Sequence, residues 1–332
     1  MVDLSALRAA IGKVEDPEIH RSLEELNMLR EVDVADDGSV RVLVALTIPG
    51  CPLKDKLTED VTAAAKTVAG VGDVEVAFTS MTDEERASLV SDIRGGTEPE
   101  ISVARAGSPT RIIAVSSGKG GVGKSSVTTN LAVALAQKGR TVGVIDADVW
   151  GFSIPRMLGI DRPPTVVDEM LFPPEAHGVR AMSMDFFVGD DQAVIWRGPM
   201  LHKALEQFLA DVHWDDPDYL LIDMPPGTGD VSISISQFLP MAQALIVTTP
   251  QATAQRVAKR AGLMALKVDQ TILGVVENMS WFTGDDGKRY PIFGEGGGEA
   301  LSADLEVPLL GRIPLVPLLR SGADAGEPVA VA

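Results

Sequence analysis

The residues with the clearest chemical meaning lie at 118–125, where the sequence reads GKGGVGKS. They fit the pattern G-x-x-x-x-G-K-[ST], in which glycines let the backbone curl until successive amide N–H groups point at a polyphosphate. In this pattern Lys124 pairs with the β- and γ-phosphates, and the hydroxyl of Ser125 ligates Mg²⁺. A glycine-rich turn without a ligand is the alternative, but an apolar strand at 111–117 and a helix beginning near Lys124 favour the phosphate loop. The predicted phosphate-binding residues are Gly118, Lys119, Gly120, Gly121, Val122, Gly123, Lys124, Ser125 and Ser126.

A carboxylate follows the apolar run YLLI, at Asp223, and a turn rich in proline and glycine comes next. An acidic residue at the carboxyl end of a parallel strand beside a phosphate loop is well placed to hold Mg²⁺ through water. The backbone at Gly227 can sense the γ-phosphate, so residues 225–230 are predicted to form a switch. Asp223 is therefore predicted to be the Walker B acid.

Two further carboxylates, Asp146 and Asp148, follow the apolar run TVGVI. Hydrolysis of a phosphoanhydride needs a group that orients water in line with the γ-phosphate, and a carboxylate within reach can do this. The alternative is that the two side chains cap a helix. The four histidines are scattered, and no Ser-His-Asp or zinc-spaced set is visible.

Apolar strands that alternate with helical stretches follow from Arg111 onward: RIIAVSS, TVGVID, YLLIDM, ALIVTT and ILGVVEN. Runs without polar alternation are expected where helices cover both faces of a parallel sheet. Residues 110–332 are therefore predicted to form a doubly wound, mostly parallel α/β domain.

The first 94 residues have the pattern of a small α+β domain. A helical spacing from Leu4 is followed by two β-rich runs around Asp37-Gly38, a hairpin signal. A helix from Leu53, a strand at 74–78 and a helix opened by Thr82 with Glu85 three residues later complete the unit. Residues 95–109 lack a sustained period and are predicted to be a linker.

Charge and cysteine content restrict the partners and the compartment. A formal charge of -18 argues against a nucleic-acid or anionic-membrane surface, because such partners are held by clustered Lys and Arg. Cys51 is the one cysteine, so no intrachain disulfide can form. The N-terminus lacks the features of a secretory signal, and no stretch is apolar for the length of a membrane span. We expect a cytoplasmic protein.

The lysine after the first glycine, Lys119, makes the loop similar to the deviant Walker A form of MinD, ParA, nitrogenase iron protein and Mrp/ApbC proteins. The chain resembles the Mrp/ApbC family of iron–sulfur cluster carriers over almost its whole length, in segments such as DADVWGFSIPRMLG, DMPPGTGD, VENMSWF and PLLGRIPLVP. The N-terminal unit resembles the MIP18-like domain, with DPEI at 16–19 and TIPGCPLKDKL at 47–57.

This resemblance implies roles that the residues alone do not give. It implies that Lys119 contacts the phosphates across the interface of a homodimer that ATP closes. The alternative for Lys119 is a solvated surface lysine. It further implies that Asp148 is the catalytic residue, with Asp146 near the metal or its waters, and that Asn278 and the loop around Pro314 contact adenine.

One departure from the family lies at 284–287, where Gly-Asp-Asp-Gly stands in place of an expected C-x-x-C. Iron–sulfur clusters favour thiolate ligands, and neither glycine nor carboxylate replaces them well. A homodimer of this chain therefore cannot build the usual interfacial cluster. Cys51, before Pro52 at a predicted helix start, is either a reactive or metal-binding thiol or a small buried hydrophobe.

The function expected from the sequence is an ATP-hydrolysing, slow, switch-type protein of iron–sulfur cluster assembly, with Mg²⁺ as cofactor and apoprotein clients or assembly proteins as partners. Two alternatives stay open. One is a positioning ATPase of the MinD or ParA kind, against which the missing amphipathic C-terminal helix and the acidic surface argue. The other is a nucleotide-gated adaptor that handles no metal.

Overall fold

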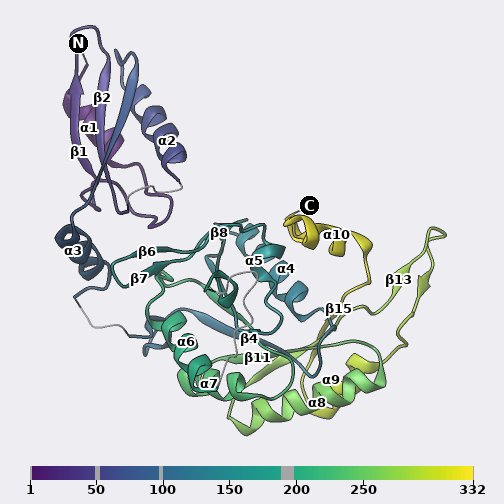
Figure 1. Ribbon diagram of the computed structural model, residues 1–332. Helices are drawn as coiled ribbons and strands as arrows, with labels where there is room; N and C mark the ends of the chain where they lie inside the picture. The colour runs from purple at the N-terminus through teal and green to yellow at the C-terminus, as the bar shows by residue number, and fades with distance from the viewer. Residues whose placement is uncertain (1, 49–52, 97–99, 188–197, 332) are drawn as a thin grey trace. The chain divides into compact units, whose positions relative to one another are not determined.

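The computed structural model describes residues 2–48, 53–96, 100–187 and 198–331. The chain divides into two compact units (Figure 1). Unit 1 comprises residues 1–99 together with Thr165–Phe172, and unit 2 comprises residues 100–164 and 173–332. None of the helices among the described residues is both long and apolar enough to cross a membrane.

Unit 1 is a small three-stranded sheet with helices, as its sequence pattern predicts. Its elements are α1 (Leu4–Gly12), β1 (Leu29–Val34), β2 (Val40–Leu46), α2 (Lys54–Lys66), β3 (Val74–Ser80) and α3 (Asp83–Ile93). The sheet order is β1-β2-β3, with β1 and β2 antiparallel and β2 and β3 parallel. Gly38 supplies the positive φ of the β1–β2 turn, at 84°. Thr82 and Glu85 form the predicted capping box of α3.

A hairpin far along the chain completes the core of unit 1. Its strands are β6 (Thr165–Val167) and β7 (Met170–Phe172), which pair antiparallel. Val167, Met170 and Phe172 are at most 5% exposed and pack in one cluster with residues of α1, β2 and α2. The Thr165 hydroxyl also donates to Glu18 Oε1 at 2.6 Å. The sequence analysis did not anticipate this insertion, because strands of three residues carry almost no periodic signal.

We predict that Phe172→Ala destabilises unit 1 although residue 172 lies far from it in sequence. Phe172 is 1% exposed, and removing a buried phenyl ring costs about 3–5 kcal/mol through lost burial and the cavity left behind. Amide exchange of β2 should therefore accelerate strongly. Phe187→Ala, at a side chain that is 51% exposed, is the matched control and should leave that exchange unchanged. Equal exchange rates in both variants would show that the hairpin does not support the core.

Unit 2 is built on an eight-stranded sheet with the order β15-β12-β11-β4-β10-β5-β9-β8. All neighbouring pairs are parallel except β8 and β9. Its strands are β4 (Arg111–Ser117), β5 (Val142–Asp146), β8 (Glu175–Ala176), β9 (Val179–Ser183), β10 (Tyr219–Asp223), β11 (Gln243–Thr248), β12 (Ile272–Glu277) and β15 (Leu309–Arg312). This confirms the predicted doubly wound, mostly parallel sheet. A small hairpin of β13 (Phe282–Thr283) and β14 (Arg289–Tyr290) lies outside it.

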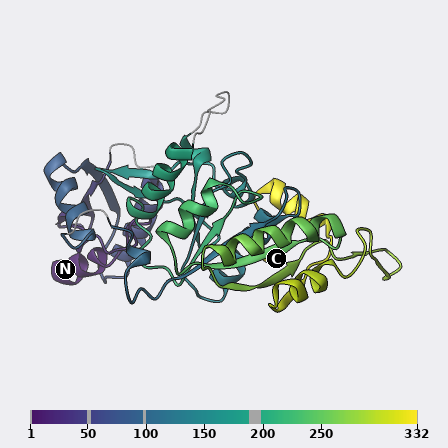
Figure 2. The same cartoon turned by 90° about the horizontal axis from the view of Figure 1, so that it is seen from below.

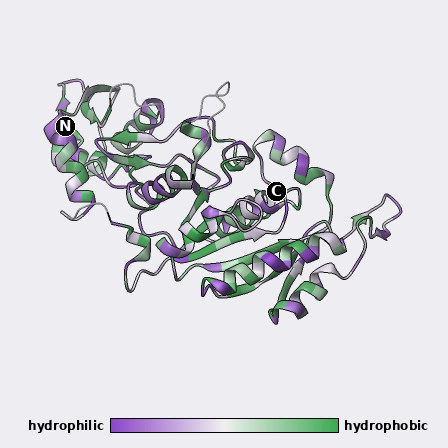
Figure 3. Cartoon of the chain, turned by 60° about the horizontal axis from the view of Figure 1, so that its bottom comes forward, coloured by the Kyte–Doolittle hydropathy of each residue, from purple (hydrophilic) through white to green (hydrophobic). Residues whose placement is uncertain are grey.

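Helices cover the sheet from both sides. The helices are α4 (Lys124–Gln137), α5 (Ile154–Met157), α6 (Gly198–Ala210), α7 (Asp230–Phe238), α8 (Ala252–Lys267), α9 (Gly297–Leu305) and α10 (Pro317–Ala325), with short 3-10 turns η1 (Ser102–Ala104), η2 (Met184–Phe187) and η3 (Val329–Val331). In Figure 1 α4 lies on one side of the sheet and α8 and α9 on the other, and Figure 2 shows the same layers from below. The sheet strands are hydrophobic over most of their length (Figure 3), as expected for a sheet buried on both faces.

The parallel register brings the predicted acids together. Asp223 ends β10 and is the register partner of Asp146, which ends β5, and of Val115 on β4. Carboxyl ends of parallel strands meet at one edge of a sheet, and the loop after β4 starts at the same edge. The fold therefore places two carboxylates beside the phosphate loop.

Candidate nucleotide site

The loop between β4 and α4 is shaped as a nest of free amide groups. Gly121 and Gly123 have φ values of 77° and 78°, a region that glycine adopts without strain. The side chain of Val122 between them is 2% exposed and packs in the core of unit 2. The amide groups of residues 120–123 donate no hydrogen bond to any other described residue. Such unpaired N–H groups at a helix N-terminus are suited to an anion.

Lys124 lies in a buried cluster with Asp223, the predicted Walker B acid. Its Nζ is 2.6 Å from Asp223 Oδ2 and 3.7 Å from Asp148 Oδ2. The Ser125 hydroxyl donates to the same Asp223 oxygen at 2.6 Å. The Thr128 hydroxyl lies 2.8 Å from Asp223 Oδ1, a contact that the sequence analysis missed. Its position one helical turn after Lys124 was the available signal.

The oxygens of this cluster suit Mg²⁺. Ser125 Oγ and the Asp223 carboxylate are hard donors, and the small ion is held in proteins by one or two such groups with waters. No group of three or more His, Cys, Asp or Glu side chains in the described part of the chain could hold a metal by itself. These donors therefore fit a magnesium ion whose remaining ligands are waters or phosphate oxygens.

Asp146 is fully buried and holds the following loop. Its carboxylate accepts hydrogen bonds from the amides of Asp148 at 3.2 Å, Ser153 at 2.9 Å and Ile154 at 3.1 Å. Burial, reinforced by the negative charge of Asp223, raises the pKa of Asp146 to about 7. Ile154 is the first residue of α5, so Asp146 accepts a hydrogen bond from an amide at a helix N-terminus. This contact fits the alternative prediction, in which the acids cap a helix.

We predict that Asp146 makes nucleotide-free protein less stable as pH rises from about 4 to about 7. The folded state keeps the Asp146 proton up to a pKa of about 7, whereas the unfolded state loses it near the ordinary value of 3.8. The unfolded state therefore binds fewer protons in this window, and the free energy of unfolding falls as pH rises. Above the folded pKa the contribution is constant.

Urea unfolding across this pH range checks the expectation. In Asp146→Asn the pH slope between 4 and 7 should be shallower than in the wild type. Asp161→Asn, which alters an exposed carboxylate of the same unit, should keep the wild-type slope. A slope that is identical in all three proteins would contradict the raised pKa of Asp146.

Asp148 is the more accessible acid of the cluster. It is 8% exposed, whereas Asp146 and Asp223 are fully buried. Burial raises the pKa of Asp148, and the nearby Lys124 partly opposes this rise. Gly227 lies in the turn after β10 with φ of 94°, and its amide donates to Ser117 O at 3.0 Å. The structure thus brings Asp148 to Lys124 and ties the Gly227 turn to the end of β4.

The remaining predicted residues lie around the loop but touch it differently. Lys119 Nζ donates to Gln251 Oε1 at 3.2 Å. Asn278, just after β12, donates from Nδ2 to Val122 O at 2.8 Å. Pro314 is half-buried in the segment after β15, which pairs with the turn at 280 through the bond from the Ser280 amide to Ile313 O at 2.9 Å.

The 284–287 segment contains no cysteine and therefore supplies no thiolate. Cys51 lies outside the described residues. The Gly284–Gly287 turn joins β13 to β14, and Asp286 there accepts from the Lys288 amide at 3.0 Å and from the Tyr290 hydroxyl at 2.9 Å. These bonds hold the pKa of Asp286 below its usual range. A side chain at Gly284 would meet the Tyr290 ring at 2.9 Å, and Gly287 has φ of 73°, so the turn itself opposes cysteines at these two positions.

Comparisons with known proteins agree with this geometry. Residues 108–332 match the family described as NUBPL iron-transfer P-loop NTPase, and residues 4–78 match that described as iron-sulfur cluster assembly protein. The chain is 52% identical over 332 residues to the iron-sulfur cluster carrier protein of Mycobacterium bovis, covering 98% of this chain and 87% of that relative. The carrier protein of Bacillus subtilis is 41% identical over 317 residues, with coverage of 95% and 89%.

Among solved structures, a nucleotide-binding protein from Archaeoglobus fulgidus in complex with ADP is similar to this chain. It is 36% identical, with a TM-score of 0.59, over 74% of this chain and 91% of that chain. The family match spans more than half of the sequence and includes the loop, both acidic strand ends and Asn278. The chain therefore belongs to the family of iron–sulfur cluster carrier proteins, and its large unit is a P-loop NTPase.

Proposed function

We propose that this chain binds ATP with Mg²⁺ at residues 118–126 and hydrolyses it slowly. It acts as a homodimer, in which ATP binding and hydrolysis control the binding or transfer of iron–sulfur clusters to apoprotein clients or assembly proteins. The observation that carries the proposal is the loop itself. Its free amide groups at 120–123 stand beside Lys124, Ser125 and Asp223, the three side chains that a Mg-triphosphate requires. We place the protein in the cytoplasm.

Each side chain has a defined part in the proposed hydrolysis. Lys124 binds the β- and γ-phosphates once it leaves Asp223, and Asp148 accepts a proton from the attacking water. Ser125 and, through water, Asp223 would hold Mg²⁺, which when bound supplies positive charge to the phosphates. We expect a slow turnover, because no arginine finger that would reach the transferred phosphate stands out in the sequence.

Three roles that the resemblance implies are part of this proposal. Lys119 Nζ donates to the neutral side chain of Gln251 in the isolated chain. In the proposed dimer it can exchange this partner for a phosphate of the nucleotide bound to the partner subunit. Asn278 Oδ1 is not needed for the bond to Val122 and can accept from the adenine amino group. Pro314 lies on the neighbouring segment and can cover the base.

The cluster itself is cargo, and the hairpin of β13 and β14 is chemically unsuited to hold it. We expect that anaerobic reconstitution with iron and sulfide gives the same iron and sulfide content in wild type and in Asp285→Ala/Asp286→Ala. Any thiolate-held cluster must use Cys51, so Cys51→Ala should remove whatever is bound. A loss of iron in the aspartate variant, with none in Cys51→Ala, would contradict this assignment.

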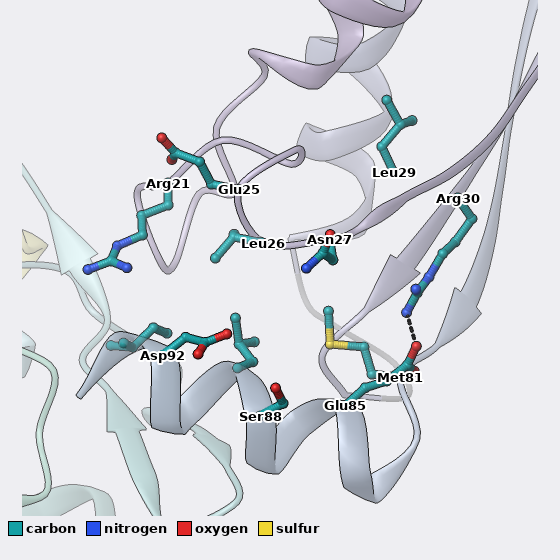
Figure 4. A pocket seen from close by; sticks show the side chains of 12 residues that line it. Arg21, Glu25, Leu26, Asn27, Leu29, Arg30, Met81, Glu85, Ser88 and Asp92 are labelled. Atoms are coloured by element: carbon teal, nitrogen blue, oxygen red, sulfur yellow. Dashed lines mark hydrogen bonds and ion pairs between the residues drawn. The ribbon is translucent and has the colours of Figure 1, made fainter. Parts of the chain in front are cut away.

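A second candidate function, a nucleotide-gated adaptor, is favoured by a pocket in unit 1. The pocket has a volume of about 360 Å³ and lies between the 21–30 segment and α3 (Figure 4). Buried Leu26, Met81 and Leu89 line it, and the ion pair between Arg30 and Glu85, at 2.6 Å, lies beside Met81. An adaptor would retain ATP-dependent client binding in Cys51→Ala, whereas a carrier would lose delivery. Client activation with and without Cys51 therefore separates the two functions.

A further inference from the structure

A buried amide side chain holds one carbonyl of the phosphate loop. Asn278 is 4% exposed, and its Nδ2 donates to Val122 O at 2.8 Å across 156 positions of sequence. The approach requires glycine at position 123, since a Cβ there would lie 2.3 Å from the same Nδ2. Glycine is therefore needed at position 123 for two reasons: it adopts the left-handed φ of 78° without strain, and it leaves room for the contact between Asn278 and the loop.

The held carbonyl fixes the direction of the next amide. Val122 C=O and Gly123 N–H belong to one peptide group, and no cis peptide bond occurs in the described residues. In a trans peptide these two groups point in opposite directions. With the carbonyl bound to Asn278, the Gly123 N–H must point away from Asn278. That N–H donates to no other described residue and is open to a ligand.

Asn278 itself is firmly positioned. Its own amide donates to Thr248 O at 2.8 Å, which extends the pairing of β12 with β11. The preceding residue, Glu277, is 2% exposed. Its carboxylate accepts hydrogen bonds from the Ser280 hydroxyl at 2.8 Å and from the Gly298 amide at 2.6 Å. Its backbone carbonyl accepts a hydrogen bond from the Ile313 amide at 2.8 Å. The Val122 side chain is buried on the other side of the contact. Both partners are therefore fixed before any ligand binds.

We propose that Asn278 is a positioning residue of the phosphate loop, which presets the Val122–Gly123 peptide group for a phosphate oxygen. This role rests on the proposed nucleotide binding and is additional to the adenine contact implied by the resemblance. It acts through the loop and does not depend on the base. A preset donor lowers the reorganisation needed on binding, and one correctly aimed hydrogen bond to a charged group is worth about tenfold in affinity.

The test compares a ligand that has a base with one that has none. Affinities of Asn278→Ala for Mg·ATP and for magnesium tripolyphosphate are measured by competition with a fluorescent ATP analogue. Both are expected to fall about tenfold. Gln270→Ala is the matched control: Gln270 is a buried amide, 8% exposed, before the start of β12 and so at the other end of that strand from Asn278. It should change neither affinity more than about twofold.

Each outcome decides the role. A loss for ATP with unchanged tripolyphosphate affinity would reduce Asn278 to a base contact and overturn the proposal. Unchanged affinity for both ligands, or a wild type that binds ATP but no tripolyphosphate, would overturn it as well. Failure of the wild type to bind ATP would instead remove the proposed function. If Asn278→Ala does not fold, Asn278→Leu keeps about the same volume without the donor and without a charge, and the same loss for both ligands is expected.

Discussion

Asp148→Asn should lower the turnover number of ATP hydrolysis about 100-fold or more while the affinity for Mg·ATP stays within about threefold. Asp148 is the acid of the cluster that solvent reaches, and it lies 3.7 Å from Lys124 Nζ. Asparagine keeps its size but cannot accept a proton from water. Single-turnover phosphate release and equilibrium nucleotide binding, measured on the same preparations, separate the two effects.

Asp161→Asn is the control for this variant, because it removes an equal charge from an exposed position of the same unit. It should hydrolyse ATP at the wild-type rate. If Asp148→Asn also hydrolyses ATP at that rate, another group orients the water. If instead its affinity falls as far as its turnover, Asp148 is a binding residue.

Lys124→Met is predicted to have two large and separable effects. Affinity for Mg·ATP should fall about 100-fold or more, because a charged partner of the β- and γ-phosphates is lost. The nucleotide-free protein should also lose about 3–5 kcal/mol of stability, because removing one partner of a buried ion pair leaves the other charge unpaired. That other charge is Asp223, which is fully buried and bound by Lys124 at 2.6 Å.

The double variant Lys124→Met/Asp223→Asn distinguishes the two effects. Its free energy of unfolding should return to within about 1 kcal/mol of the wild type, since the uncompensated carboxylate is gone. Its nucleotide affinity should remain as low as in the single variant. A double variant that is no more stable than Lys124→Met would show that the ion pair does not stabilise the empty site.

Much of unit 2 could be predicted because its signals are local. Five apolar runs correspond to β4, β5, β10, β11 and β12, and the acids at their ends follow from the rule that ligands bind at the carboxyl edge of a parallel sheet. The glycines of the loop are equally readable, since Gly121 and Gly123 adopt positive φ.

What escaped prediction depends on contacts between distant residues. The β6–β7 hairpin has strands of three residues, too short for a period, and only its packing in unit 1 explains Phe172. The ion pair of Lys124 with Asp223 joins two residues that the sequence assigned to separate ligands, a phosphate and a metal. Asn278 was connected with adenine by resemblance alone, whereas its bond to Val122 needs the β12 end and the loop to meet in space.

The central claim is that residues 118–125 hold the triphosphate of ATP together with Mg²⁺. Isothermal titration of the purified chain with Mg·ATP tests it most directly. The predicted result is one nucleotide bound per chain, with affinity that drops sharply when Mg²⁺ is chelated and is lost in Lys124→Met. Folded wild-type protein that takes up no adenine nucleotide, or that binds it equally well after Lys124→Met, would contradict the claim.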